Sequence, residues 1–274
     1  EGDIFIDCTG YKRIFSSKSD WISFKDNLPM NSVTTFTRKH QESMVTKADK
    51  LKIGWCWQIP TQERLGCGYV SCDEWGDDVV DEIKSNYSDA KILKSFKFES
   101  GKLKKSWNHN VISLGLAYHF LEPLQATNIH LTLVQIEMLC QKCIRDTKDR
   151  TLNSNVILYY NKHIDNLIED FKNFINIHYS CDSRVKMTDY NNEIIDLLKV
   201  RGLFHEDILQ GYGSCGIQLW GHTLLGLNHL TKQDCHTFLS EMNSYDEVKE
   251  ISIELENTFT NTPFLTYEEL IDIL

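Results

Sequence analysis

Residues 107–134 read WNHNVISLGLAYHFLEPLQATNIHLTLV, and the rest of the chain is organised around this stretch. The apolar run from Val111 to Ala117 contains small residues, which let a backbone lie close against a flat or bulky neighbour. Glu122-Pro123 follows it. Proline fixes φ, removes a donor and pushes the preceding residue towards extended geometry, so we expect the chain to turn there.

The residues after this turn predict a helix, and the start of that helix is a candidate anion site. From Ile129 onward the apolar spacing is that of a helix, with Thr127 or Asn128 as a suitable N-cap. The first N–H groups of a helix have no partner within it, and the helix dipole favours negative charge there. From the residues alone an ordinary capped helix is the simpler interpretation, because caps are common and anion sites are few.

Size and charge exclude several classes of protein. The chain has 274 residues, 41% of them hydrophobic, and a formal net charge of −10. It is long enough for one large domain or two modest ones with a buried core. Without a basic tail or a Lys/Arg block, we expect no nucleic-acid partner. No apolar run has the length of a spanning helix and no signal peptide is visible, so we expect a cytoplasmic protein without a membrane partner.

The nine cysteines are scattered without a disulfide framework, which indicates free thiols in a reducing compartment. Cys140 and Cys143 form a lone CxxC inside the predicted helix. A zinc or redox site needs a second pair or a strand–turn–helix context, and neither is present. We therefore expect no metal site here, and one of the two cysteines buried as a small apolar residue.

The chain before the central stretch predicts mainly strands. Residues 3–7 alternate as a strand does, and Gly10 after them allows close approach of a ligand. Residues 16–50 are polar, and we expect them to be irregular. Further expected elements are a helix at 77–86 and a strand at 90–99 ended by Gly101.

Residues 50–59 and 65–71 predict a hairpin through the linker TQER. Trp55 and Trp57 lie two residues apart, so they share one face of the sheet. From physical chemistry alone, the pair is interpreted as two core aromatics on a buried face.

The chain after the central stretch predicts helices. Residues 152–179 carry apolar side chains at i, i+3 and i+4, which indicates a long amphipathic helix with His178 as a core histidine. Residues 189–202 predict another helix, closed by Gly202. The remaining expected elements are a glycine-rich loop at 210–216 and short helices at 232–242 and 245–254.

Three motifs, in this order, resemble hallmarks of the flavin-dependent tryptophan halogenases. The first is the Asp-Cys-Thr-Gly step that ends a strand at 7–10, and the second is GWxWxIP, matched at every fixed position by 54–60. The third is a strand, EPL, a four-residue step at 125–128 and then Ile. The family has Glu where this chain has Gln125, a departure that bears on the chemistry and not on the fold.

The resemblance implies an α/β (α+β) fold, the C-terminal part of an FAD-dependent monooxygenase-like fold. It would hold the last flavin-domain strand, an antiparallel sheet and a helical substrate module. The implied segments are 1–15 and 105–135 for the remainder of the FAD-binding module, 16–104 for the mainly β region with GWxWxIP, and 136–274 for the helical substrate module. The family's GxGxxG and catalytic lysine are expected before Glu1, because no GxGxxG occurs in these residues.

The resemblance also assigns roles to single residues. The implied roles are flavin contact for Leu116, Ile129 and Gly10, halide binding by the backbone amides of Thr127 and Asn128, the place of the family's glutamate for Gln125, and a position near the flavin for Trp55 and Trp57.

The implied activity is oxidation of a halide with O2 and reduced FAD, followed by halogenation of an electron-rich aromatic substrate of the tryptophan or indole type. Reduced FAD would come from a separate flavin reductase, and a homodimer is a further expectation. Two alternatives stay open, because an amide at Gln125 cannot act as a base. One is a flavin monooxygenase that does not halogenate, and the other is a non-catalytic relative.

Overall fold

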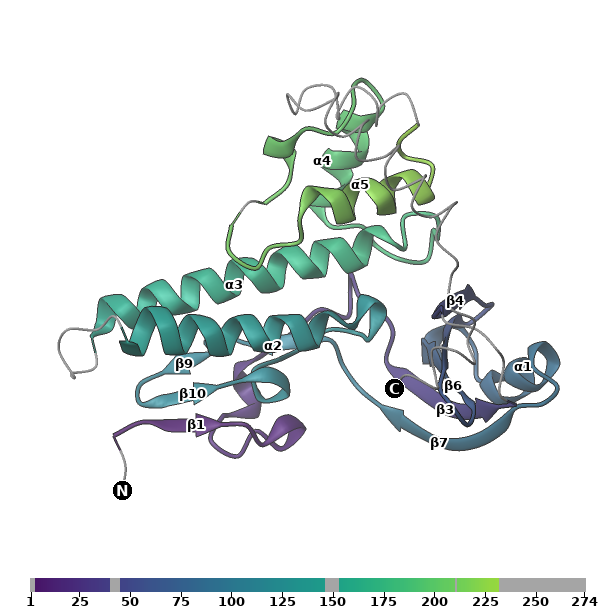
Figure 1. Cartoon of the computed structure of the whole chain (residues 1–274), viewed down its shortest axis with the longest axis horizontal. Coiled ribbons are helices and arrows are strands. Elements are labelled where there is room, and N and C mark those ends of the chain that lie inside the picture. The colour runs from purple at the N-terminus through teal and green to yellow at the C-terminus, as the bar shows by residue number, and fades with distance from the viewer. Residues whose placement is uncertain (1–2, 40–44, 146–152, 210, 232–274) are drawn as a thin grey trace, which may run out of the picture. The chain divides into compact units, whose positions relative to one another are not determined.

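Figure 1 shows the computed structural model of the chain, which describes residues 3–39, 45–145, 153–209 and 211–231. The described residues form two compact units. One consists of residues 3–29 and 99–231, and the other of residues 30–98.

The unit formed by residues 30–98 is a five-stranded antiparallel sheet with one helix against it. The strand order is β4-β5-β6-β3-β7. Its elements are β3 (Ser32–Arg38), β4 (Lys47–Lys50), β5 (Gly54–Pro60), β6 (Leu65–Ser71), a 3-10 turn (Asp73–Trp75), α1 (Val79–Asn86) and β7 (Lys91–Lys97). Ile83 of α1 is completely buried in a core that includes Phe36 and Tyr69. The helix therefore covers one face of the sheet and excludes water from it.

Strand β3 overturns the expectation that residues 16–50 are irregular. It pairs with both β6 and β7 and so lies inside the sheet. Its serine and threonine side chains do not show the apolar pattern of a buried strand. They are accommodated inside the sheet because they find hydrogen-bond partners on neighbouring strands: Thr34 Oγ1 lies 2.8 Å from Ser95 Oγ. Phe36 is buried on the core side. Threonine is well suited to a pleated strand, so the polar composition of this segment does not indicate irregular structure.

The hairpin of β5 and β6 confirms the expected return strand at 65–71. Its register runs from Gly54 opposite Ser71 to Pro60 opposite Leu65. The expected strand at 50–59 is confirmed from Gly54 onward as β5, but Lys50 ends β4, and the chain turns through residues 51–53 between the two strands. A Cβ atom at Gly54 would lie 1.9 Å from the backbone oxygen of Val70, so only glycine fits at the start of β5.

The other unit contains two small sheets. The first has the order β1-β10-β9, with β1 parallel to β10 and β9 antiparallel to β10. The second has the order β11-β8-β2 and is antiparallel. The strands are β1 (Phe5–Asp7), β2 (Trp21–Ser23), β8 (Gly101–Leu103), β9 (Trp107–Asn108), β10 (Val111–Ser113) and β11 (His119–Phe120).

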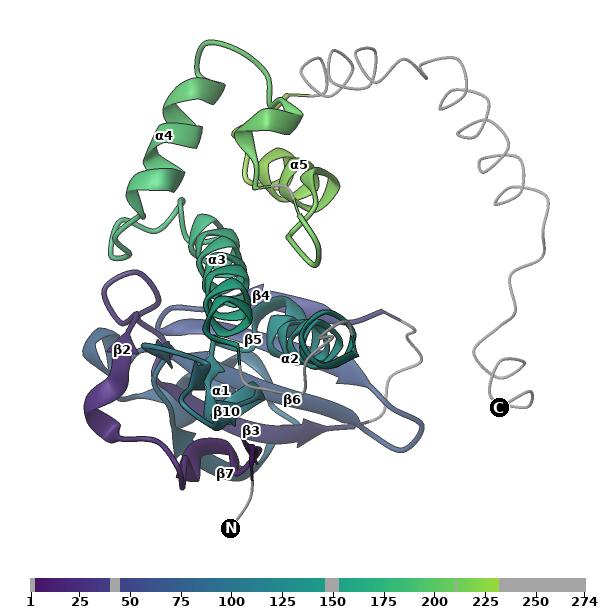
Figure 2. The same ribbon diagram turned by 90° about the vertical axis from the view of Figure 1, so that its left-hand side faces the viewer.

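Helices cover one face of the β1-β10-β9 sheet, as Figures 1 and 2 show for α2 and α3. The helices of this unit are α2 (Thr127–Glu137), a π-helical continuation (Met138–Arg145), α3 (Ser154–Ile177), α4 (Asp189–Leu198) and α5 (Ile217–Gly226). Short 3-10 turns are η1 (Gly10–Lys12), η2 (Lys18–Asp20), η4 (Gly115–Ala117), η5 (Leu124–Ala126) and η7 (His205–Asp207).

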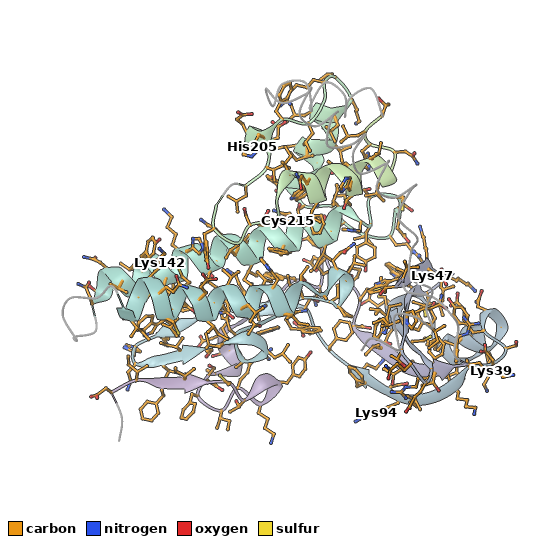
Figure 3. The ribbon with its side chains drawn as sticks, in the orientation of Figure 1. Lys39, Lys47, Lys94, Lys142, His205 and Cys215 are labelled. Carbon is orange, nitrogen blue, oxygen red and sulfur yellow. The ribbon has the colours of Figure 1, made fainter. Side chains whose placement is uncertain are left out.

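Helix α3 confirms the amphipathic helix expected at 152–179 within its described part. Its apolar side chains form the centre of this unit's core; they are Tyr160, Ile164, Leu167, Ile168, Phe171, Phe174 and Ile175. His178 is a core histidine as expected: its Nδ1 lies 2.7 Å from the Phe174 oxygen, and desolvation lowers its pKa. Trp220 of α5 packs against Phe174 at 5.5 Å between ring centroids. Cys215, in the segment before α5, is completely buried (Figure 3).

Two expected boundaries are wrong, and one expected loop is confirmed in its described part. Helix α4 ends at Leu198 with Lys199 as its C-cap, so Gly202 does not close it. Gly101 opens β8 rather than ending the preceding strand, because its missing side chain lets Ile22 approach: a Cβ would lie 2.4 Å from the Ile22 oxygen. Within the expected loop at 210–216, residues 211–216 form neither helix nor strand. The helices expected at 232–242 and 245–254 lie outside the described residues.

Candidate functional site

The loop before α2 contains two consecutive residues in the left-handed region. Gln125 has φ 59° and ψ 13°, and Ala126 has φ 52° and ψ 28°. Neither residue is glycine, and a Cβ atom makes this conformation unfavourable by roughly 1–2 kcal/mol per residue. The pair turns the chain sharply into α2 and leaves the Gln125 side chain exposed. Such strain persists only where surrounding contacts hold it.

One of these contacts comes from Asn128, in the first turn of α2. The N–H of Leu121 donates to Asn128 Oδ1 at 2.8 Å, and Asn128 Nδ2 donates to the Leu121 oxygen at 2.5 Å. The amide thus satisfies both backbone groups of Leu121, which is completely buried. Gln125 lies in the loop that this pair of bonds closes.

A second contact fixes Glu122, whose side chain is completely buried. The hydroxyl of Tyr179, just after α3, donates to the Glu122 carboxylate. The Glu122 N–H donates to Ser100 Oγ at 3.1 Å. The loop is therefore attached to the end of α3 and to the segment before β8, two places far from it in sequence.

The structure corrects the expected cap of α2. The N-cap is Ala126, without a side-chain cap bond, and Thr127 and Asn128 both lie in the first turn. The Asn128 amide is used by Leu121 instead. The Thr127 hydroxyl is buried and has no hydrogen-bond partner among the described residues. A helix start with unpaired N–H groups and a buried, unpartnered hydroxyl is a suitable environment for a small anion.

Turn η4 lies against α2, and Gly115 makes this contact possible. Gly115 has φ 54°, and a Cβ there would lie 3.1 Å from Thr132 Oγ1. Its N–H donates to Gln135 Oε1 at 3.0 Å. This confirms the expectation that small residues in the apolar run let the backbone approach a neighbour closely.

The three residues expected at the flavin lie on neighbouring elements. Turn η4, which carries Leu116, contacts both η1, which begins at Gly10, and α2, which carries Ile129. Leu116 is 37% exposed and Ile129 is 67% exposed. Gly10 has φ 63°, and no atom lies within 4 Å of a Cβ placed on it. Leu116 and Ile129 therefore expose apolar side chains, and Gly10 exposes backbone, without cover from other described parts of the chain.

Trp55 and Trp57 lie in the unit of residues 30–98. Their ring centroids are 5.9 Å apart, which confirms that they share one face of β5. Trp55 is 8% exposed, and its indole N–H has no partner among the described residues. The Trp57 ring lies over Gly68, where a Cβ would be 2.0 Å from it. The two rings thus form an aromatic surface on the sheet.

Among the described residues, no group of three or more His, Cys, Asp or Glu side chains could hold a metal ion. Cys140 is exposed and Cys143 is buried, which confirms the expectation that one of the pair is buried. Both lie on the π-helical continuation of α2. Within the described parts of the chain, no helix has the length and apolar character needed to cross a membrane.

The residues that hold the loop were missed by the sequence-based expectations. The sequence pattern marks Glu122 only through the turn it forms with Pro123, yet a single acid among apolar neighbours signals a buried partner. Its partner Tyr179 is 57 residues away, and no local pattern points to it. The side chain of Asn128 was expected only as a helix cap.

Comparisons with known proteins show which family this chain resembles. The model of the family described as tryptophan halogenase matches residues 1–194. The tryptophan 6-halogenase ThaL of Streptomyces albogriseolus is 27% identical over 200 residues, which are 68% of this chain and 36% of ThaL. The tryptophan 7-halogenase RebH of Lentzea aerocolonigenes is 26% identical over 197 residues, which are 67% of this chain and 36% of RebH.

A solved structure shows the same fold. The tryptophan 6-halogenase SttH of Streptomyces toxytricini superimposes with a TM-score of 0.80 at 19% identity, covering 100% of this chain and 57% of SttH. The chain thus spans little more than a third of the length of ThaL and RebH. Its mixture of helices and sheets is that of the halogenase structures, and with more than half of its residues matched by the family model, the chain belongs to the tryptophan halogenase family.

Proposed function

We propose that the protein carrying this chain is an FAD-dependent halogenase. It uses O2, reduced FAD and a halide to halogenate an electron-rich aromatic substrate of the tryptophan or indole type. The observation that carries the proposal is the left-handed pair Gln125-Ala126 at the start of α2, in a chain that belongs to the tryptophan halogenase family. Strained backbone of this kind is concentrated at functional sites.

In this proposal the flavin binds against an apolar surface. Leu116 and Ile129 offer exposed apolar side chains, and Gly10 offers backbone without a Cβ, so all three fit a flat ring system. A flavin bound there supplies the oxidising chemistry, while the chain orients it and excludes water. We assign segments 1–15 and 105–135 to the remainder of an FAD-binding module in a monooxygenase-like fold.

The halide is assigned to the start of α2. The backbone amides of Thr127 and Asn128 lie in its first turn, where N–H groups lack helical partners and the dipole favours an anion. The buried hydroxyl of Thr127 adds a donor without another described partner. These donors lie in the first turn of α2, directly after a loop that is already held in place, so they need no rearrangement to meet the halide.

Gln125 takes the position next to the substrate carbon. Its exposed side chain can reach a bound ring, and its amide can donate or accept a hydrogen bond. It cannot accept the proton that leaves the ring, nor can it carry a charge to stabilise a cationic intermediate. Proton removal is therefore expected to be slow in this protein. The same feature favours a second candidate, a flavin monooxygenase that uses the pocket without halogenating.

We assign the other segments by the same scheme. Residues 16–104 form the mainly β region, whose Trp55 and Trp57 would lie near the flavin and keep monooxygenase substrates away from it. Residues 136–274 form the helical substrate module. A flavin reductase supplies reduced FAD, and a homodimer is part of the proposal. The eight free thiols among the described residues support a cytoplasmic location.

The test is a product assay on the full-length protein. It combines purified protein, FAD, a flavin reductase, NADH, bromide and tryptophan or indole, and mass spectrometry detects the products. We expect a brominated product. A hydroxylated product without bromine, from a protein that binds and reduces FAD, would replace this function with the monooxygenase. No product at all under those conditions would favour a non-catalytic relative.

A further inference from the structure

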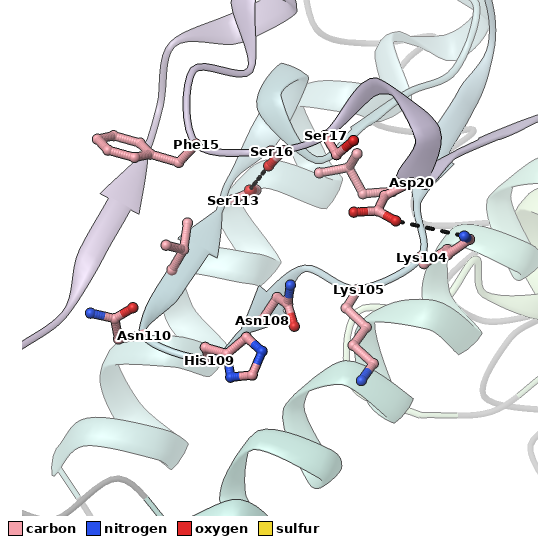
Figure 4. Close-up of a pocket in the computed structure, with 12 residues that line it drawn as sticks. Phe15, Ser16, Ser17, Asp20, Lys104, Lys105, Asn108, His109, Asn110 and Ser113 are labelled. Atoms are coloured by element: carbon pink, nitrogen blue, oxygen red, sulfur yellow. Dashed lines mark hydrogen bonds and ion pairs between the residues drawn. The ribbon is translucent and has the colours of Figure 1, made fainter.

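A cavity of about 570 Å³ opens on the unit of residues 3–29 and 99–231 (Figure 4). It lies between the segment after η1 and the hairpin of β9 and β10. The residues that line it are Phe15, Ser16, Ser17, Asp20, Leu103, Lys104, Lys105, Asn108, His109, Asn110, Val111 and Ser113. Most of its lining belongs to segments 1–15 and 105–135, which we assign to the FAD-binding module, but the flavin contacts Gly10, Leu116 and Ile129 do not line it. Its volume is in the range of small-molecule sites, roughly 300–1,000 Å³.

The cavity is lined by hydrogen-bond donors that the protein does not use. Among the described residues, the side chains of Lys105, Asn108 and Asn110 have no hydrogen-bond or ion-pair partner. Figure 4 shows them around one opening together with the imidazole of His109. Ser16 Oγ and Ser113 Oγ lie 3.1 Å apart, so at least one of the two hydroxyls can still donate to a ligand. Unused donors that line one cavity can form the polar part of a ligand site.

The charge of the cavity is opposite to that of the chain. Two lysines face one acid, Asp20, which lies 3.6 Å from the amine of Lys104. Lys105 is left as the unneutralised cation of the described lining. The whole chain has a formal net charge of −10, so this local excess of positive charge selects for an anionic ligand.

The hairpin holds these donors on a fixed backbone. His109 has φ 54°, as the first residue of a two-residue turn requires, although glycine is the usual residue there. The turn is anchored because Trp107 Nε1 donates to the His109 oxygen at 3.0 Å. The Trp107 ring is buried and packs edge-on against Tyr160 at 5.7 Å between centroids. The donors therefore need little ordering when a ligand arrives.

The donor set indicates which anion fits. The described lining has no arginine, whose planar fork binds carboxylates and phosphates alike; it has a lysine point charge with amides and hydroxyls that can donate from several sides. This arrangement suits a tetrahedral phosphate. The cavity is much larger than a phosphate ion, and the exposed ring of Phe15 and the side chain of Val111 offer apolar contact for an attached body. We propose that the cavity binds a phosphate monoester of nucleoside monophosphate size.

The test is a chemical-shift titration of the 15N-labelled chain with AMP, with adenosine as the uncharged comparison and inorganic phosphate as the smallest probe. We expect saturable shifts of the amides of residues 108–110 with AMP, weaker binding of phosphate and none of adenosine. Lys105→Gln should weaken AMP binding by about tenfold, because it removes a charged hydrogen bond. Lys94→Gln is the matched control: it makes the same charge change on β7 (Figure 3) and should leave the affinity unchanged.

A second variant moves the affinity the other way. Asp20→Asn removes the acid beside Lys104, so AMP should bind about threefold more tightly or better, which a loss of folding cannot imitate. Added salt should weaken binding to the unchanged chain. The proposal is overturned if AMP leaves the hairpin amides unmoved or if adenosine binds as tightly as AMP. Equal weakening by Lys105→Gln and Lys94→Gln would overturn it as well.

Discussion

The side-chain amide of Asn128 binds both backbone groups of Leu121, accepting from its N–H at 2.8 Å and donating to its oxygen at 2.5 Å. These two bonds close the loop that contains Gln125 and Ala126. The side-chain amide pairs with the Leu121 backbone as a neighbouring strand would, because its oxygen accepts one hydrogen bond and its nitrogen donates another. The left-handed pair is therefore held by a side chain of the helix that it introduces.

Asn128→Asp tests this closure. The carboxylate can still accept from Leu121 N–H, but it cannot donate to the Leu121 oxygen, which is left unpaired in a buried position. We expect a loss of about 1–3 kcal/mol in the free energy of unfolding, measured by urea denaturation at neutral pH. Asn192→Asp, on the exposed side of α4, is the matched control. Equal stability of the two variants would show that the amide does not hold the loop.

Tyr179→Phe tests the anchor of Glu122. The substitution keeps the ring and removes the hydroxyl that donates to the buried carboxylate. We expect a destabilisation of about 1–3 kcal/mol, because a buried acceptor loses a partner. Tyr159→Phe removes an exposed hydroxyl on α3, the helix that precedes Tyr179, and should be close to neutral. Thermal unfolding followed by circular dichroism compares the pair, and a neutral Tyr179→Phe would contradict the anchor.

Ala126→Gly tests the strain in the loop. Ala126 has φ 52°, where glycine has no Cβ penalty, so the variant should be more stable by up to about 1 kcal/mol. Ala90→Gly, between α1 and β7, has no such strain to relieve and should lose stability through chain entropy. If both variants lose the same stability in urea denaturation, the left-handed conformation of Ala126 is not strained.

Asp170 gives the fold a pH dependence. Desolvation raises its pKa to about 7, although the N–H of Cys215 donates to its Oδ2 at 2.7 Å. The folded state then binds a proton that the unfolded state releases at a lower pH. Stability should therefore fall as pH rises from about 4 to about 7 and stay level above that.

Asp170→Asn should remove this part of the pH dependence, because an amide does not ionise and its oxygen can still accept from Cys215. Urea denaturation at pH 5 and pH 8 should show a drop of a few kcal/mol in the parent chain and a smaller drop in the variant. An identical drop in both proteins would mean that Asp170 is not the titrating group.

Much of the fold could be predicted because its signals are local. The return strand of the hairpin, β6, and the buried face of α3 follow from period-two and period-3.6 patterns. Strand β3 escaped prediction because its serine and threonine side chains are satisfied only by neighbouring strands, which are distant in sequence. Its burial depends on tertiary pairing rather than on composition.

The candidate site could be proposed from the sequence, but its geometry could not be predicted. The motif around Glu122-Pro123 marked the place, and helical spacing predicted α2. The left-handed pair at Gln125 and Ala126 could not be predicted, because neither residue type favours that region. The bond from Tyr179 to Glu122 joins residues 57 positions apart, so only the folded chain brings it about.

The most direct test of the proposed halogenation site is the rate of brominated product formation by the full-length protein and its Gln125→Glu variant. Gln125 is exposed, so the new carboxylate is not buried without a partner. With bromide, indole, FAD and a flavin reductase, we expect the variant to brominate about tenfold faster, roughly 1.4 kcal/mol of transition-state stabilisation. No brominated product from either protein, with FAD bound and reducible in both, would contradict the assignment of this loop to halogenation.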